Sequence, residues 1–310
     1  MERVQAVVAH LASASSTGAA STSDVASGCS RTCVAPVYYR GTGEMVANPY
    51  SPGGVEAGLE SGAIAKVDVE IQDVRGRDHS LTKQGYILVK HDTAVTDWAD
   101  DAQITEIYYK EIAELAQQIT GAKKCVVASH IMRSTDTKPG QRPTAFFIHN
   151  DFCDAFGEQL QCLMDGGGRT KLTDAGVTPE ELQGHRLQML SFWRSASGGP
   201  ILRRPLAVVD ATSIAPEDLG VYEYHPAGLR QKDWDMPLPV LLGTSTPSPT
   251  HKWGFYPDMQ TDEVLVKLQY DSGAPSPHNG VGVHVAFDDP NTPEDAPARV
   301  SNEVRVFCLH

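Results

Sequence analysis

The sequence predicts a mainly β protein with flanking helices, built on a double-stranded β-helix, the jelly-roll or cupin-like core. Two observations predict this fold. After residue 120 the chain consists largely of short apolar runs separated by Pro, Gly, Asn and Asp, a pattern typical of sandwiches and jelly rolls rather than of βαβ sheets. One of these runs ends in His149-Asn150-Asp151, which suits a metal site at the end of a strand.

The composition is that of an ordinary globular protein. The 310 residues are 41% hydrophobic and 21% charged, which is enough for one large core. The net charge of −13 argues against the non-specific attraction by which basic proteins bind nucleic acid. No apolar run approaches the roughly 20 residues that a membrane-spanning helix needs, so we expect no membrane association.

The cysteines indicate a reducing compartment. The six of them show no paired metal-ligand spacing, and Cys29 and Cys33 form only an isolated C-x3-C. The first eleven residues are too polar and too short for the apolar part of a secretory signal. Reduced thiols in a cytoplasmic protein are therefore expected.

The chain is expected to divide into residues 1–62, a partly flexible N-terminal arm, and residues 63–310, a single jelly-roll domain. Residues 11–28 are small and polar and cannot bury enough apolar surface to offset the entropy of ordering. Residues 51–62 are rich in glycine and resemble a loop.

The domain itself begins with two strands and a helix. Val67, Val69 and Ile71 alternate with polar residues, as in a strand, and 85–89 is a short apolar run. An amphipathic helix is expected between an Asp cap at 100–101 and Gly121. Further strands are expected at 125–128, 145–149, 187–193, 205–210, 253–256, 263–270, 280–287 and 301–309, with helices as an option at 153–164 and 178–183.

The His149-Asn150-Asp151 triplet is the candidate metal site. Residues i and i+2 share one face of a strand, so both side chains can reach one ion, although short motifs also arise by chance. A facial triad of two histidines and one carboxylate needs a third ligand from a distant strand and leaves three positions open on iron. The downstream candidates are His185, His225, His251, His278, His284 and His310.

His284 is the preferred third ligand, and His251 is its rival. The strand after His284 carries Arg299, Ser301 and Arg305, and an arginine one strand beyond the distal histidine would bind the far carboxylate of 2-oxoglutarate. The order of predicted strands would also place the two histidines on the second and seventh of eight strands. His251 begins its own strand and is followed by a cation on the next, so spacing alone leaves it open.

Three further residues are candidates for the substrate pocket, together with His251. Arg194 ends an apolar strand, where it is either a surface charge or a pocket residue. His130 and Arg133 follow the strand at 125–128 and allow the same two interpretations.

Four stretches carry a family resemblance: 80–101, 108–127, 251–272 and 283–307. On these the chain resembles the AsaB-like hydroxylase/desaturase family of Fe(II)/2-oxoglutarate-dependent oxygenases, from about residue 67 to the C-terminus.

The resemblance implies Fe(II) as the metal, 2-oxoglutarate as co-substrate, O2 as oxidant, and hydroxylation or desaturation of a small molecule, typically in secondary metabolism. It places the metal ligands at His149, Asp151 and His284, and it matches Arg299, Ser301 and Arg305 to co-substrate residues. The chain departs from the family near the pocket, for example at Ser195, where a proline is usual after Trp-Arg, so the substrate does not carry over.

Two other classes of function stay open. A cupin-like hydrolase or isomerase would use a divalent metal in the same three ligands without 2-oxoglutarate or O2. A non-catalytic partner subunit of an oxygenase complex is the other alternative, since one family member works with a second protein. The sequence also leaves open whether the chain is a monomer, a homodimer or part of such a complex.

Overall fold

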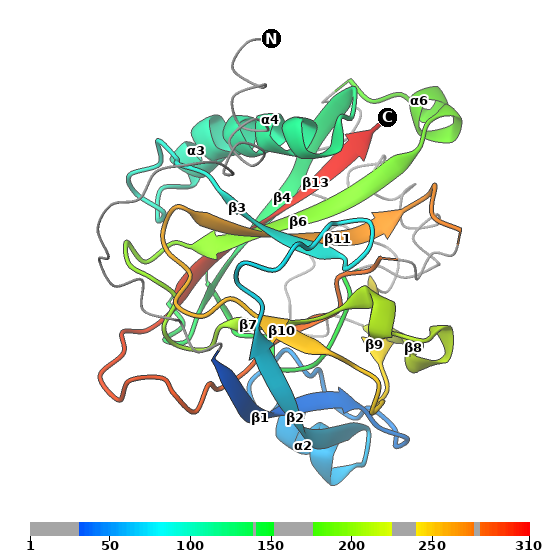
Figure 1. The fold of residues 1–310 in the computed structure, drawn as a ribbon, viewed down its shortest axis with the longest axis vertical. Coiled ribbons are helices and arrows are strands. Elements are labelled where there is room, and N and C mark those ends of the chain that lie inside the picture. The colour runs from blue at the N-terminus through cyan, green and yellow to red at the C-terminus, as the bar shows by residue number, and fades with distance from the viewer. Residues whose placement is uncertain (1–30, 139–140, 152–175, 225–239, 276–279) are drawn as a thin grey trace, which may run out of the picture. The chain divides into compact units, whose positions relative to one another are not determined.

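The computed structural model describes residues 31–138, 141–151, 176–224, 240–275 and 280–310, and Arg31–His310 form one compact unit. A six-stranded sheet with a helix along its outer face lies opposite a five-stranded sheet (Figure 1). The polar run at 11–28, the optional helix at 153–164, and His225 and His278 lie outside the described residues.

The six-stranded sheet has the order β3-β11-β6-β13-β4-β5, antiparallel except for the parallel pair β4–β5. Its outer face is mostly apolar and packs against the helix, whereas its inner face carries many of the buried polar side chains. The bounds are β3 Tyr86–Lys90, β11 Glu263–Asp271, β6 Leu187–Ser195, β13 Val300–Leu309, β4 Lys124–Ser134 and β5 Arg142–Pro143.

The predicted amphipathic helix is present as three consecutive segments: α3 (Asp101–Gln103), a π-helical turn (Ile104–Tyr108) and α4 (Tyr109–Thr120). The Asp100 side chain caps the first turn by accepting from the backbone N–H of Ala102, and Gly121 ends the helix with φ 69°. Its buried stripe includes Tyr108 and Ile112, and each such side chain contributes about 1.5–3 kcal/mol by leaving water.

The five-stranded sheet has the order β1-β2-β10-β7-β12. Residues 145–149, predicted as a strand, make isolated bridges at the β12 edge rather than a continuous ladder. The Ile148 N–H also donates to the Tyr38 carbonyl (2.9 Å) at the opposite edge of the sheet, so the sheet curls round on itself and encloses an apolar core. The bounds are β1 Thr32–Arg40, β2 Ile64–Asp73, β10 Trp253–Phe255, β7 Leu206–Val209 and β12 His284–Ala286.

The strand β1 and the short helix α2 (Gly54–Glu60) lie within the stretch 1–62 that the composition assigned to an arm. They belong to the same compact unit as the rest, which begins at Arg31 rather than at residue 63. Alternate residues of β1 are buried (Cys33, Ala35, Val37 and Tyr39), while the residues between them face outward. This alternation is the pattern of a strand, and an assignment based on the small polar residues of the N-terminal stretch missed it.

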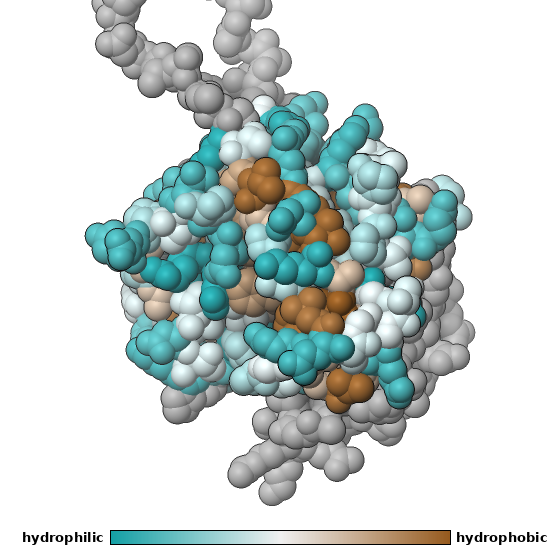
Figure 2. Space-filling model, turned by 90° about the horizontal axis from the view of Figure 1, so that it is seen from below, coloured by the Kyte–Doolittle hydropathy of each residue, from teal (hydrophilic) through white to brown (hydrophobic). Residues whose placement is uncertain are grey.

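Seen from below, the molecular surface is mostly hydrophilic, with several small separate hydrophobic areas (Figure 2). The exposed large apolar side chains among the described residues are Val34, Val46 and Leu59. The peripheral elements are α6 (Pro179–Gly184), which matches the optional helix at 178–183, two 3-10 turns (Ala211–Ser213 and Pro216–Asp218), and the hairpin of β8 (Leu219–Tyr224) and β9 (Val240–Ser245). None of the helices in the described part of the chain has the length and apolar character needed to cross a membrane.

Counted along the chain from β4, eight segments divide between the two sheets. The segments β4, β6, β11 and β13 belong to the larger sheet, and 145–149, β7, β10 and β12 to the smaller one. This is a double-stranded β-helix, and it puts the segment ending in His149 second and β12 seventh, as the sequence predicted.

Candidate metal centre and co-substrate site

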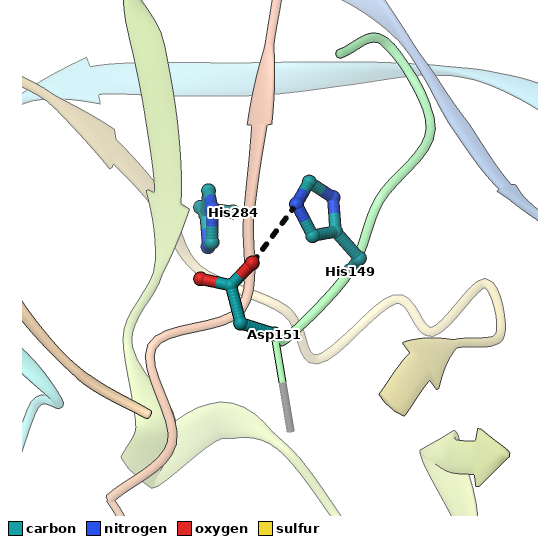
Figure 3. A group of neighbouring side chains, drawn as sticks. All are labelled: His149, Asp151 and His284. Atoms are coloured by element: carbon teal, nitrogen blue, oxygen red, sulfur yellow. Dashed lines mark ion pairs between the residues drawn. The ribbon is translucent and has the colours of Figure 1, made fainter. Parts of the chain in front are cut away.

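His149, Asp151 and His284 come together between the two sheets. Each is buried, and one ligand atom from each lies within 4.8 Å of the others. Figure 3 shows the two rings and the carboxylate directed toward a common space. The ring centroids of the two histidines are 4.5 Å apart, and His149 Nε2 lies 3.8 Å from Asp151 Oδ1.

The backbone explains why these residues meet. His149 and His284 are directly opposite each other, and each N–H donates to the other's carbonyl (3.2 and 2.9 Å). Their neighbours Ile148 and Val285 point into the apolar core of the smaller sheet, so alternation directs both imidazoles the other way, toward the larger sheet. One β-bridge between two segments that are far apart in the sequence thus brings two of the ligands together.

Gln269 of β11 fastens the following turn. Its side-chain oxygen accepts from the Asp151 N–H (3.0 Å), and its carbonyl accepts from the Asn150 side chain (3.2 Å). Sequence reasoning missed this residue, because the alternation of 263–270 suggests an ordinary strand with its polar residues in solvent.

Both imidazoles are held in the tautomer that a metal ligand requires. His149 Nδ1 donates to the Phe147 carbonyl (2.8 Å) and His284 Nδ1 to the Gly282 carbonyl (2.7 Å). A carbonyl only accepts, so Nδ1 carries the hydrogen and Nε2 keeps its lone pair. Burial lowers the pKa of both rings, which favours the neutral form.

Asp151 supplies the anionic ligand. Its Oδ1 accepts from Arg305 Nη2 (2.6 Å), whereas its buried Oδ2 has no hydrogen-bond partner among the described residues. Burial acts to raise the pKa of Asp151, but Arg305, with smaller contributions from His284 and His149, outweighs it and holds the pKa below the usual value. Two neutral imidazoles and a carboxylate oxygen in need of a partner fit Fe(II), which this donor set favours.

Arg299, just before β13, is a buried cation that contacts no counter-ion among the described residues. The residue is 3% exposed, its Nη1 donates to the Arg204 carbonyl, and it lies over the Trp193 ring at 5.5 Å. Its Nε and Nη2, and the buried hydroxyl of Ser301 two residues later, have no hydrogen-bond partner in the described parts of the chain. Burial lowers the pKa of Arg299 to about 9, with the charges of Arg133 and Arg204 adding to the effect, so it stays charged at neutral pH. These groups fit a carboxylate.

Arg305 lies near the middle of β13, the strand that Arg299 directly precedes. The resemblance matched it to a co-substrate residue, but its guanidinium binds Asp151, a member of the metal group. Six residues of strand separate it from Arg299, or about 20 Å of backbone. The structure therefore does not place Arg305 beside Arg299.

A buried ion pair that sequence reasoning missed lies next to Arg305. Lys267 of β11 is 0% exposed and donates to Glu303 Oε1 (3.3 Å), which also accepts from the Ser191 hydroxyl (2.5 Å). Burial lowers the pKa of Lys267. Burial acts to raise the pKa of Glu303, but nearby charges, chiefly those of Lys267 and Arg305, together hold it well below its ordinary value.

His251 is not part of the metal group. Its Nε2 contacts Asp218 Oδ2 (3.1 Å), and its Nδ1 contacts the hydroxyl of Tyr39 (3.1 Å), which stacks on it. His251 is thus a hydrogen-bonded polar residue at the start of a strand, which is the ordinary interpretation of such a histidine. It does not support His251 as third ligand or as a residue of a pocket at the metal group.

His130 and Arg194 lie on the outer, helix-covered face of the larger sheet, so the structure places neither of them at the metal group. His130 contacts the Tyr109 hydroxyl (2.9 Å) and Asp101 (3.2 Å). Arg194 lies over the rings of Trp98 and Tyr108, at 5.6 Å from each. The surface alternative also fails for Arg194, which is buried under the helix.

Arg133 is the one of these candidates that faces the site. It is directly opposite Ser301 in the β4–β13 pair, and its Nη1 donates to the Pro143 carbonyl (2.9 Å). Its positive charge helps to lower the pKa values of His149 and Arg299, which places it on their side of the sheet.

Comparison with known proteins agrees with this architecture. A family model described as "Oxidoreductase/YMDC permease-like domain" matches residues 40–309. The alpha-ketoglutarate-dependent dioxygenase phiK of Fungal sp. (strain ATCC 74256) is 31% identical over 250 residues, covering 78% of this chain and 83% of phiK. The hydroxylase/desaturase CTB9 of Cercospora beticola is 30% identical over 252 residues, covering 78% and 76% of the two chains.

A solved structure and a third relative extend the comparison. The structure of the iron and alpha-ketoglutarate-dependent endoperoxidase NvfI has a TM-score of 0.69 at 24% identity, covering 90% of this chain and 98% of NvfI, and it shows the same fold. The Fe(II)/2-oxoglutarate-dependent dioxygenase nvfI of Aspergillus novofumigatus is 32% identical over 213 residues, 68% of each chain.

A jelly roll that brings two histidines and one aspartate together on its inner side defines the class of mononuclear non-heme metal enzymes. Within it, the chain belongs to the family of Fe(II)/2-oxoglutarate-dependent dioxygenases that includes these fungal hydroxylases/desaturases. The family and the fold class inferred from the sequence are thereby confirmed.

Proposed function

We propose that this chain is an Fe(II)- and 2-oxoglutarate-dependent oxygenase that hydroxylates, desaturates or cyclises a small molecule in secondary metabolism. One observation carries the proposal. The triad of His149, Asp151 and His284 shares the inner side of the jelly roll with Arg299, a buried cation with two donors that have no partner within the described ranges. A metal-dependent hydrolase or isomerase that works without 2-oxoglutarate does not require such a cation, whereas a co-substrate dicarboxylate pairs with it.

The three ligands and two further residues have separate roles in this proposal. His149 and His284 hold Fe(II) through Nε2, with Asp151 as the anionic ligand, and Arg299 and Ser301 hold the distal carboxylate of 2-oxoglutarate. When bound, the iron supplies the O2 chemistry that couples decarboxylation of 2-oxoglutarate to oxidation of a C–H bond. For hydroxylation the balance is R–H, O2 and 2-oxoglutarate to R–OH, succinate and CO2; for desaturation or ring closure, water and the oxidised product replace R–OH.

The surroundings suit this chemistry. Because the ligand atoms are buried, they are shielded from bulk water and keep a fixed protonation state: neutral imidazoles and an ionised carboxylate. The unbound cation of Arg299 is costly at this depth, and pairing with the co-substrate offsets that cost.

The cellular setting is part of the proposal. Cys33, Cys125 and Cys308 are free thiols, which supports a cytoplasmic enzyme. It acts on a small-molecule substrate, as a monomer, as a homodimer or with a partner protein.

The test is metal-dependent binding of the co-substrate. With Mn(II) in place of Fe(II), calorimetry should show 2-oxoglutarate binding to the wild type and none to the metal-free protein. His284→Ala should abolish that binding, whereas His185→Ala, at an exposed histidine, should not. With Fe(II) and O2, succinate should form in the wild type and not in Asp151→Ala. Binding of 2-oxoglutarate that needs no metal, or a folded His284→Ala variant that binds it normally, would refute the assignment.

A further inference from the structure

The ion pair between Arg305 and Asp151 joins the last strand to the turn after the second segment of the jelly roll. Arg305 Nη2 donates to Asp151 Oδ1 at 2.6 Å, and the side chains are 13% and 2% exposed. The other carboxylate oxygen, Oδ2, is buried without a hydrogen-bond partner in the part of the chain that the structure describes. The two oxygens of one carboxylate therefore differ in their surroundings.

This asymmetry affects how the carboxylate can bind a metal. A carboxylate can offer one or both of its oxygens to an ion. Oδ1 lies 3.8 Å from His149 Nε2, but the guanidinium already uses it, and a metal on the same oxygen would bring two cations together. Oδ2 remains as the oxygen that needs a partner.

The number of ligand oxygens matters to the reaction. A facial triad that uses three positions of an octahedral ion leaves three open, two for a chelating 2-oxo acid and one for O2. A carboxylate that takes two positions would leave only two. The reaction thus requires Asp151 to bind through a single oxygen.

Arg305 is itself held by neighbouring charges. Glu303 lies two residues earlier on the same face of β13, and its charge helps to raise the pKa of Arg305. Glu303 in turn accepts from Lys267 and from the Ser191 hydroxyl. Lys267, Glu303, Arg305 and Asp151 alternate in sign, so this buried row is neutral in sum, as burial requires.

We infer that Arg305 is a positioning residue that holds Asp151 Oδ1 and so limits the carboxylate to one metal–oxygen bond through Oδ2. The inference rests on the proposed function. It assigns Arg305 a role at the metal, distinct from the co-substrate role of Arg299.

The experiment counts the water molecules on bound Mn(II), from the enhancement of water-proton relaxation, without 2-oxoglutarate. In the wild type three positions should hold water. In Arg305→Met the carboxylate is free to chelate, so two should, and the enhancement per bound Mn(II) should fall by about a third. Arg305→Lys, which keeps a charged donor, should restore the wild-type value.

Arg299→Met is the matched control, because it removes another buried guanidinium from the residue that directly precedes the same strand. It should keep the wild-type enhancement without co-substrate, while more 2-oxoglutarate is needed to displace the waters. An unchanged enhancement in folded, Mn(II)-saturated Arg305→Met would overturn the inference. If that variant does not fold, Arg305→Met/Glu303→Gln, which keeps the buried charges balanced, should show the same fall, and an unchanged value there would likewise overturn it.

Failure of the proposed function gives a different result. If Asp151→Ala enhances water relaxation as strongly as the wild type, the metal is not at this triad, whatever Arg305 does.

Discussion

Replacing Arg299 by methionine should have two opposite effects: a more stable free protein and much weaker binding of 2-oxoglutarate. Methionine keeps an unbranched apolar chain of similar length but removes the charge. In the wild type this charge is buried, and its Nε and Nη2 lack hydrogen-bond partners among the described residues. The protein therefore bears a cost that only the bound co-substrate relieves.

The gain in stability follows from the burial of the guanidinium. The fall in the pKa of Arg299 from 12.5 to about 9 corresponds to roughly 5 kcal/mol of unfavourable free energy. Methionine also loses the bond to the Arg204 carbonyl and the contact with Trp193, together about 2–4 kcal/mol. The balance is a gain of about 2 kcal/mol, which in a domain of this size raises Tm by about 3–4 °C.

The loss of co-substrate affinity should be larger. Truncating one partner of a buried charge pair costs about 2–5 kcal/mol, which corresponds to a rise in Kd of about 30-fold to several thousand-fold. The two effects separate a binding cation from a structural one, since a structural cation would stabilise the free protein.

Thermal melts of the Mn(II)-loaded protein, with and without 2-oxoglutarate, measure both effects. The wild type should melt higher when the co-substrate is present, because the ligand binds only the folded state. Arg299→Met should melt higher than the wild type without it and gain little on its addition. Arg77→Met, at an exposed arginine, should behave as the wild type. A variant that melts lower than the wild type yet still responds fully to 2-oxoglutarate would refute the reasoning.

Three further predictions concern stability. Ile112→Ala in α4 should cost about 2–5 kcal/mol in urea unfolding, because it leaves a cavity between helix and sheet; a loss below 1 kcal/mol would show that the helix is loosely packed. Lys267→Met should cost about 3–5 kcal/mol because Glu303 loses its lysine partner, and Lys267→Met/Glu303→Gln should recover most of this loss. Equal losses in the two variants would exclude the pairing. Burial lowers the pKa of His149 and His284 below 6.5, so the unfolded chain binds more protons than the folded one below that pH. The metal-free protein should therefore lose stability from pH 7 to 5, by up to about 1.4 kcal/mol per pH unit for each of the two histidines. A stability that does not change with pH over this range would contradict the neutral state of the two rings.

The metal group was predictable because the alternation of side chains along a strand and the order of the strands can both be inferred from the sequence. The His149-Asn150-Asp151 spacing puts two side chains on one face, and the count of apolar runs puts His284 opposite them. Spacing alone did not exclude His251, since the pattern does not show which side of the smaller sheet a side chain takes. In the structure, His251 lies with Tyr39 and Asp218, away from the metal group.

The polar residues around the metal were harder to predict. Lys267 and Gln269 alternate with apolar residues, which is also the pattern of a strand with one face in water. Here the polar face is directed inside the jelly roll, and the apolar face is covered by α4. The same inversion explains why His130 and Arg194 lie under the helix and not beside the metal group.

The smaller sheet closes through Tyr38 and residues 145–149, so the segments that carry the two histidines are buried on both faces. One face is polar and lines the metal group, and the other packs into an apolar core. Each imidazole therefore has tightly packed apolar side chains on the opposite face of its own strand, and this packing fixes its position. Loops around the rim can vary to suit new substrates without altering the spacing of the ligands. A substitution that leaves a small cavity in this apolar core, by contrast, would move the histidine on the other face of the strand and so shift the bound iron.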